Sequence, residues 1–101
     1  MLDNVRQKDT LIVSISGELD HYAAPKIRAE LDELLQDKSI RKLCLDLKAM
    51  SFMDSSGIGV LMGRYKLLNR RGGEIYVKNM NSHVRRIFDM SGLRQIVGVQ
   101  E

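Results

Sequence analysis

The sequence predicts a single α/β domain, with a mixed β-sheet of about four to five strands and helices packed on it. Along the chain, segments in which apolar residues recur every second position, as in strands, alternate with segments that have helical spacing. A length of 101 residues suits one hydrophobic core. Hydrophobic residues make up 44% of the chain and charged residues 29%, a composition that excludes a disordered protein. No linker-like stretch interrupts residues 1–101, so we expect one domain over this whole range.

The chain is expected to start with a β-hairpin. Apolar residues alternate with others in Leu11–Ser16, which predicts a half-buried strand that ends at Gly17. A weaker strand is expected over Leu2–Gln7, and Lys8–Thr10 supplies the polar turn between the two.

A helix and a buried strand follow the hairpin. Helical spacing of apolar residues predicts a helix over Ala23–Gln36, with Pro25 early enough to fit the first turn. Leu43–Leu47 returns to the two-residue period of a strand. We expect a loop over Lys48–Asp54.

A second helix is predicted from Ser55 or Ser56 to Arg70. Basic residues in its last turn and the glycines after Arg71 are typical of a helix end. Its other basic residues, Arg64 and Lys66 among them, are expected on the solvated face.

The remaining elements are shorter. Glu74–Val77 is a predicted strand, and Asn81 or Ser82 can cap a short helix that carries Phe88. Ile96–Val97 is the last expected strand. The order β-β-α-β-α-β-α-β implies parallel neighbours joined by right-handed crossovers.

Composition also excludes several classes of function. Aromatic residues make up only 5% of the chain, too few for a base-stacking surface, and we expect no direct contact with nucleic acid. Neither a basic leader nor a run of about 20 apolar residues is present, so no membrane segment is expected. Cys44 is the sole cysteine. These features favour a cytoplasmic protein.

The segment Phe52–Gly59 is the most unusual part of the sequence. Asp54 or Ser55 can cap the helix that follows, which is a purely structural role worth about 1 kcal/mol. Each glycine within a helix costs about 1 kcal/mol against alanine, and Gly57, Gly59 and Gly63 share this one. They serve either close packing on the sheet or the approach of another protein, and both explanations remain open.

Catalytic readings of this segment lack their motifs. The glycine spacing of a nucleotide-binding loop is incomplete, and two distant histidines do not form a metal site. A serine hydrolase would need Ser55 or Ser56 with His21 or His83 as the base, but the upstream glycine of the nucleophile turn is missing.

A serine that is a substrate rather than a catalyst fits the residues better. Phosphorylation of Ser55 would add about −1.5 to −2 charges at the start of a helix, where the macrodipole favours an anion. The new charge and bulk beside Asp54 would displace a partner docked there.

The chain resembles the sporulation anti-sigma factor antagonists of the STAS (sulfate transporter and anti-sigma factor antagonist) domain family. The resemblance extends over nearly the whole chain and rests on a series of motifs in order. These motifs are Gly17–His21, Ser51–Val60, Gly63–Lys66, Gly72–Glu74 and Arg86–Leu93.

The resemblance implies a regulatory binding protein and no enzyme, without a cofactor or metal of its own. Ser55 would be phosphorylated by an anti-sigma factor kinase that carries ATP and magnesium, and a serine phosphatase would restore it. The unphosphorylated form would bind the kinase and free a sporulation sigma factor of the sigma-F type. The partner surface implied by the resemblance consists of Asp20, Asp54, Ser55, Ser56, Gly57, Ile58 and Gly59. An antagonist for a general stress-response sigma factor is the alternative.

Overall fold

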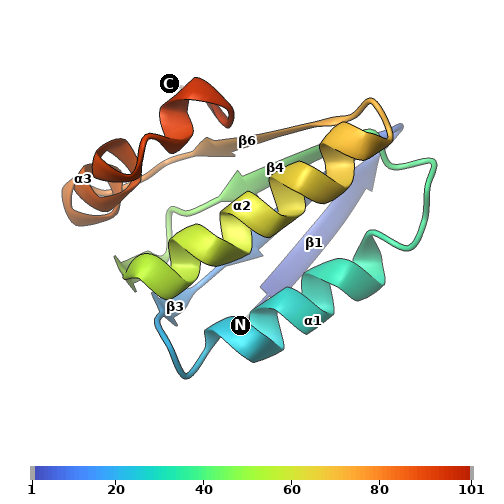
Figure 1. Cartoon of the computed structure of the whole chain (residues 1–101). Helices are drawn as coiled ribbons and strands as arrows, with labels where there is room; N and C mark the ends of the chain where they lie inside the picture. The colour runs from blue at the N-terminus through green and yellow to red at the C-terminus, as the bar shows by residue number, and fades with distance from the viewer. Residues whose placement is uncertain (1, 101) are drawn as a thin grey trace.

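The computed structural model describes residues 2–100, in which helices cover one face of a β-sheet (Figure 1). The elements in chain order are β1 (Leu2–Gln7), β2 (Thr10–Ile15), β3 (Gly17–Leu19), α1 (Ala24–Leu34), β4 (Lys42–Asp46), β5 (Met50–Met53), α2 (Ser55–Arg70), β6 (Glu74–Lys78), α3 (Ser82–Ser91), the 3₁₀ turn η1 (Leu93–Gln95) and β7 (Gly98–Gln100). The predicted α/β class is confirmed.

Within residues 2–100 the main sheet has five strands in the order β1-β2-β4-β6-β7. The first pair is antiparallel and the others are parallel, so the sheet is mixed as expected. Lys8, with a φ of 56°, occupies the left-handed conformation that the tight turn between β1 and β2 requires. The predicted hairpin is therefore confirmed, with its first strand over the expected residues.

The core lies between the sheet and the helices. Alternate residues of the central strands point into it, and Val13, Leu45 and Val77 have no exposed surface. The helices supply Leu31, Leu61, Leu68 and Phe88, each nearly or fully buried. Among residues 2–100 no helix lies on the opposite face of the main sheet (Figure 1).

A second, two-stranded sheet occupies part of the expected loop Lys48–Asp54. β5 pairs in parallel with β3, and Leu19 lies opposite Met53. The prediction of a plain loop was wrong because only the ends of β5 are buried, which hides the two-residue period of a strand.

The last strand was predicted at Ile96–Val97 and lies instead at β7, two residues later. Val97 is fully buried, but its N–H donates to the carbonyl of Leu93 at 2.7 Å. This bond belongs to the end of the 3₁₀ turn, so Val97 is unavailable for the ladder. A buried apolar pair was therefore misread as a strand.

Arg64 was expected in solvent, and this prediction was wrong. Its side chain is only 8% exposed, between α1 and α2, and its Nε lies 3.0 Å from Asp32 Oδ1. Burial lowers the pKa of the guanidinium and Asp32 opposes this shift. The two groups form an ion pair but are misaligned for a hydrogen bond.

No helix in residues 2–100 is both long and apolar enough to cross a lipid bilayer.

Candidate functional site

The candidate site is the start of α2, where β5 delivers the chain into the helix. Asp54 has an extended backbone, and its Oδ1 accepts a hydrogen bond from the Ser56 N–H at 2.8 Å. The carbonyl of Asp54 accepts hydrogen bonds from the N–H groups of Gly57 and Ile58. Of the two capping candidates, Asp54 is therefore the one that caps the helix. Ser55, the first helical residue, is exposed and has no part in the cap.

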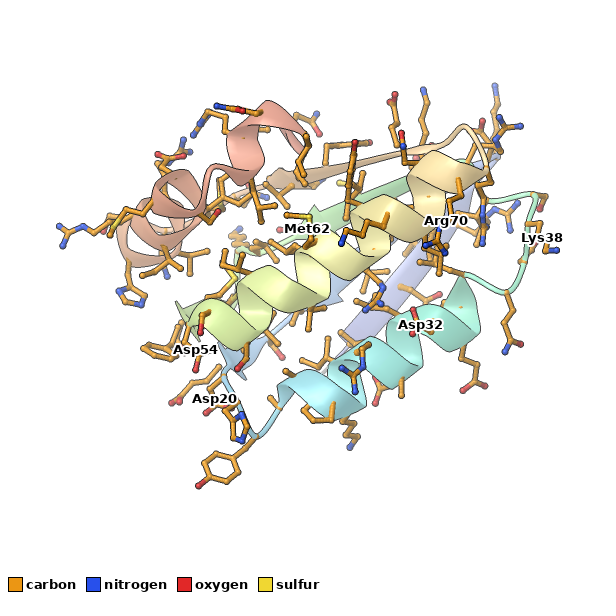
Figure 2. The ribbon with its side chains drawn as sticks, in the orientation of Figure 1. Asp20, Asp32, Lys38, Asp54, Met62 and Arg70 are labelled. Carbon is orange, nitrogen blue, oxygen red and sulfur yellow. The ribbon has the colours of Figure 1, made fainter. Side chains whose placement is uncertain are left out.

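Asp20 lies at the same end of the molecule, in the loop that leads to α1 (Figure 2). Its Oδ1 accepts hydrogen bonds from the N–H groups of Tyr22 and Ala23, at 3.0 and 2.9 Å. The small sheet brings this loop to the start of α2, because the Asp54 N–H also donates to the Leu19 carbonyl at 3.4 Å. Two distant segments of the sequence thus build one surface.

The helix glycines have different roles. A Cβ on Gly57 would lie 2.5 Å from Met53 Cγ and 3.0 Å from Leu19 Cγ, so this glycine serves close packing against the small sheet. A Cβ on Gly59 or Gly63 would meet no atom within 4 Å. Packing on the sheet therefore does not explain the spacing of Gly59 and Gly63, and their bare backbone is open to an approaching molecule.

A shallow groove of 330 Å³ opens between the first turns of α1 and α2. Ser56 and Gly59 line it on the side of α2, and His21, Pro25 and Arg28 line it on the side of α1. Two of the predicted partner-contact residues therefore face a depression in the surface beside Ser55.

Exposed aromatic side chains extend this surface, and no motif of the sequence identifies them. Tyr22 is 90% exposed beside Asp20. Phe52 is 36% exposed and stacks on His83, with ring centroids 5.1 Å apart. Aromatic residues are enriched at protein interfaces. The few aromatic residues of this chain were therefore the available signal for this part of the surface.

The histidines have partners other than the serines. His83 stacks on Phe52, and His21 packs edge-on against Tyr22 with 5.7 Å between ring centroids. Within residues 2–100 neither histidine makes a hydrogen bond to Ser55 or Ser56. The described residues also contain no group of three or more potential ligands able to hold a metal ion.

The electrostatics of the helix start decide what a phosphate would meet. The Ser56 N–H is already taken by the Asp54 carboxylate, so a phosphate on Ser55 would stand beside that charge. The helix dipole favours an anion here, whereas Asp54 and Asp20 oppose it. A phosphorylated site would thus carry concentrated negative charge.

Known proteins resemble this chain over nearly its whole length. The family model described as STAS domain matches residues 1–101. An anti-sigma F factor antagonist of Paenibacillus polymyxa is 46% identical over 94 residues, which are 93% of this chain and 80% of that protein. An anti-sigma-B factor antagonist of Bacillus subtilis is 34% identical over 98 residues, 97% of this chain and 88% of that protein.

Two solved structures of the anti-sigma factor antagonist SpoIIAA superpose over the full chain. Its unphosphorylated form gives a TM-score of 0.85 at 28% identity over 89% of that chain. The phosphorylated form from Bacillus gives 0.76 at 27% identity over 92% of that chain.

Proposed function

The chain belongs to the STAS domain family, and we propose that it is an anti-sigma factor antagonist switched off by phosphorylation of Ser55. The observation that carries the proposal is the exposed hydroxyl of Ser55 at the first position of α2. Because Asp54 caps the helix, modification of Ser55 removes no bond of the fold. A binding protein of this kind is regulatory rather than enzymatic. Similarity to SpoIIAA, solved in both forms, supports the phosphorylation step.

In this proposal the partner kinase supplies the chemistry of the switch. The Ser55 hydroxyl oxygen attacks the γ-phosphorus of ATP held with magnesium on the anti-sigma factor, the bond to ADP breaks, and the hydroxyl proton passes to a base of the kinase. A serine phosphatase reverses the step by hydrolysis. Ser55 contributes an exposed nucleophile at the tip of a helix.

The proposed docking surface combines Asp20, Ser55, Ser56, Ile58 and Gly59. Ser56 and Gly59 line the groove between α1 and α2, and Ile58 is half-buried. Asp54 and Gly57, the other two predicted contacts, also have structural roles, since Asp54 fixes the helix start and Gly57 packs it on the small sheet.

Phosphorylation would end binding by a local change. A phosphoserine adds about −1.5 to −2 charges and three acceptor oxygens beside Asp54. A kinase surface shaped for an uncharged hydroxyl would meet both new bulk and like charge, and the complex would dissociate faster. Rearrangement of the backbone is unnecessary.

A sigma-F-type sporulation factor is the proposed beneficiary, and an antagonist for a stress-response factor such as sigma-B is the alternative. Identity to the Paenibacillus anti-sigma F factor antagonist is 46%, against 34% to the Bacillus subtilis anti-sigma-B factor antagonist. Titration of the protein against purified kinases of both systems distinguishes the two. Tighter binding to the stress-response kinase would favour the alternative.

The decisive experiment is phosphorylation by the cognate kinase with Mg-ATP. Mass spectrometry should find one phosphate, located on Ser55, and a phosphate on Ser56 would contradict the assignment. Ser55→Ala should still bind the kinase and accept no phosphate.

Ser55→Asp should lose affinity for the kinase. Its matched control is Gln36→Glu, because Gln36 is exposed just after α1, at the other end of the molecule from the start of α2 (Figure 1). The control changes the net charge by the same amount and should bind as the unmodified protein does. Equal losses in the two variants would show that charge at position 55 is not specific.

A further inference from the structure

The uncovered face of the main sheet carries a stripe of apolar side chains that runs across the strands. Val5, Ile12, Cys44 and Tyr76 are consecutive partners in the register of β1, β2, β4 and β6. The strand neighbours of Ile12, Cys44 and Tyr76 belong to the core between sheet and helices, whereas these three residues do not. Val5 is 58% exposed, Ile12 and Tyr76 are half-buried, and Cys44 is buried with 1% exposed. Val5, Ile12 and Tyr76 therefore form a second apolar surface without a cover in the described chain.

Charged pairs lie on both sides of the stripe, toward the two ends of strands β4 and β6. At one end Lys42 on β4 stands opposite Glu74 on β6, with 4.0 Å between Nζ and Oε1. At the other end the signs are exchanged, since β4 carries Asp46 and β6 carries Lys78. Each strand thus presents one positive and one negative group, and the central part of the face has no net charge.

We propose that this face is the interface of a homodimer, formed by a two-fold axis that runs parallel to the strands between β4 and β6. The rotation places β4 of each copy over β6 of the other. Lys42 then faces Glu74 of the second copy, and Asp46 faces Lys78. In the middle, Tyr76 of each copy lies over β4 of the other, at the position of the buried Cys44. Each charge lies opposite its counterion, and the sheets pack face to face with aligned strands, as in β-sandwiches.

The relief of the face fits the same rotation. A hollow of 640 Å³ lies where β7 flanks β6, lined by Tyr76, Ile96 and Gly98 among others. Gly98 stands opposite Tyr76 in the register and adds no side chain to the surface. The axis between β4 and β6 also brings β2 of one copy over β7 of the other. The half-buried Ile12 of each copy then points toward the hollow over Gly98.

The charge pattern favours a second copy over other occupants. An anionic membrane or a nucleic acid attracts surfaces with a net positive charge, whereas each lysine of the central face has a carboxylate opposite it. A pattern that inverts between neighbouring strands and again between the two ends matches its own rotated copy.

Sedimentation equilibrium of the full chain tests the proposal. The protein should dimerise reversibly. A protein that stays monomeric up to about 1 mM would overturn the proposal, because the free energy of dimerisation would then be weaker than about 4 kcal/mol. Lys42→Glu places like charges opposite one another at two positions of each dimer. It should raise the dimer dissociation constant at least about tenfold.

The double variant Lys42→Glu/Glu74→Lys exchanges the two charges and should restore the dimer, because each residue again faces its counterion. The matched control is Lys38→Glu, an equal change of charge at an exposed position in the loop before β4 (Figure 2). It should dimerise as the unmodified protein does. A dimer that tolerates Lys42→Glu, or a double variant that remains monomeric, would place the contact elsewhere. Phosphorylation of Ser55 does not enter these measurements, so they stand apart from the proposed function.

Discussion

At the scale of single residues, the ion pair between Arg64 and Asp32 is unequally buried. The Arg64 side chain is 8% exposed, whereas that of Asp32 is 43% exposed. Loss of Arg64 would leave a carboxylate that water can reach. Loss of Asp32 would leave a buried guanidinium without its counterion, and an unpaired buried charge is the more costly state.

Asp32→Asn should therefore destabilise the protein more than Arg64→Met does. We expect about 1–3 kcal/mol for Asp32→Asn and less than about 1 kcal/mol for Arg64→Met, whose side chain keeps much of the packing. Urea unfolding of both variants gives the comparison. The reverse order would mean that the contact acts through packing of the arginine stem and not through its charge.

For Asp54, the contribution of the hydrogen bond can be separated from that of the negative charge. Asp54→Ala removes the acceptor of the Ser56 N–H and should cost about 1 kcal/mol of unfolding free energy. Asp54→Asn keeps an acceptor oxygen and should cost much less. Thermal or urea unfolding measures both. Equal losses would show that the negative charge, rather than the hydrogen bond, holds the helix start.

At the scale of elements, α2 contains two glycines whose replacement by alanine should change the stability in opposite directions. Gly57→Ala would force its Cβ against Met53 and Leu19, and we expect a loss of about 1–3 kcal/mol. Gly59→Ala enters open space and should stabilise the helix by about 1 kcal/mol. Urea unfolding measures both changes.

The same variants connect stability with partner binding. If the bare backbone of α2 is kept for a partner, Gly59→Ala should be more stable and yet bind the anti-sigma kinase more weakly. Calorimetric titration with the kinase provides the second measurement. Unchanged affinity in a stabilised Gly59→Ala variant would remove Gly59 from the docking surface.

At the scale of the whole molecule, Arg6 on the edge strand β1 is tied to the loop between α1 and β4. Its Nη1 lies 2.8 Å from Asp37 Oδ2. Hydrogen bonds from Ser39 and Arg6 hold the pKa of Asp37 at about 2, below its ordinary 3.8. A carboxyl with a lowered pKa stabilises the fold above its ordinary pKa, and the contribution disappears as the pH falls through the lowered value.

Asp37→Asn should therefore be less stable than the unmodified protein at neutral pH, with a difference that shrinks between pH 3.8 and about 2. Urea unfolding across this range follows the difference, and NMR titration of the carboxyl gives its midpoint. A difference that stays constant down to pH 2 would exclude the Asp37 ionisation as its source.

The sequence was sufficient for the long elements and insufficient for the small sheet. Helical spacing and the two-residue period located α1, α2 and the central strands, because one face of each is buried in a single core. β3 has three residues, and the middle of β5 is exposed, so neither shows a period. The placement of Arg64 failed because its burial depends on Asp32 of another helix, which no local pattern reveals.

The helix start at the centre of the candidate site was predictable from the sequence, and the extent of the surface around it was less so. Capping chemistry indicated Asp54 or Ser55 as the cap, whereas the choice of Ser55 as the phosphorylated residue came from the resemblance to the STAS domain family. The groove beside them depends on how α1 packs against α2, and the exposure of Phe52 and Tyr22 follows from the tertiary fold. The different roles of Gly57 and Gly59 likewise required the position of Met53.

The small sheet of β3 and β5 also bears on how such a switch can diversify. Backbone hydrogen bonds and the buried Leu19 and Met53 hold the two loops in register. The exposed side chains of Glu18 and Phe52, opposite each other in that register, take no part in it. These two side chains can change through mutation without loss of the pairing between β3 and β5. Gene duplicates could in this way acquire separate partners, and several switches could operate in one cell without cross-talk.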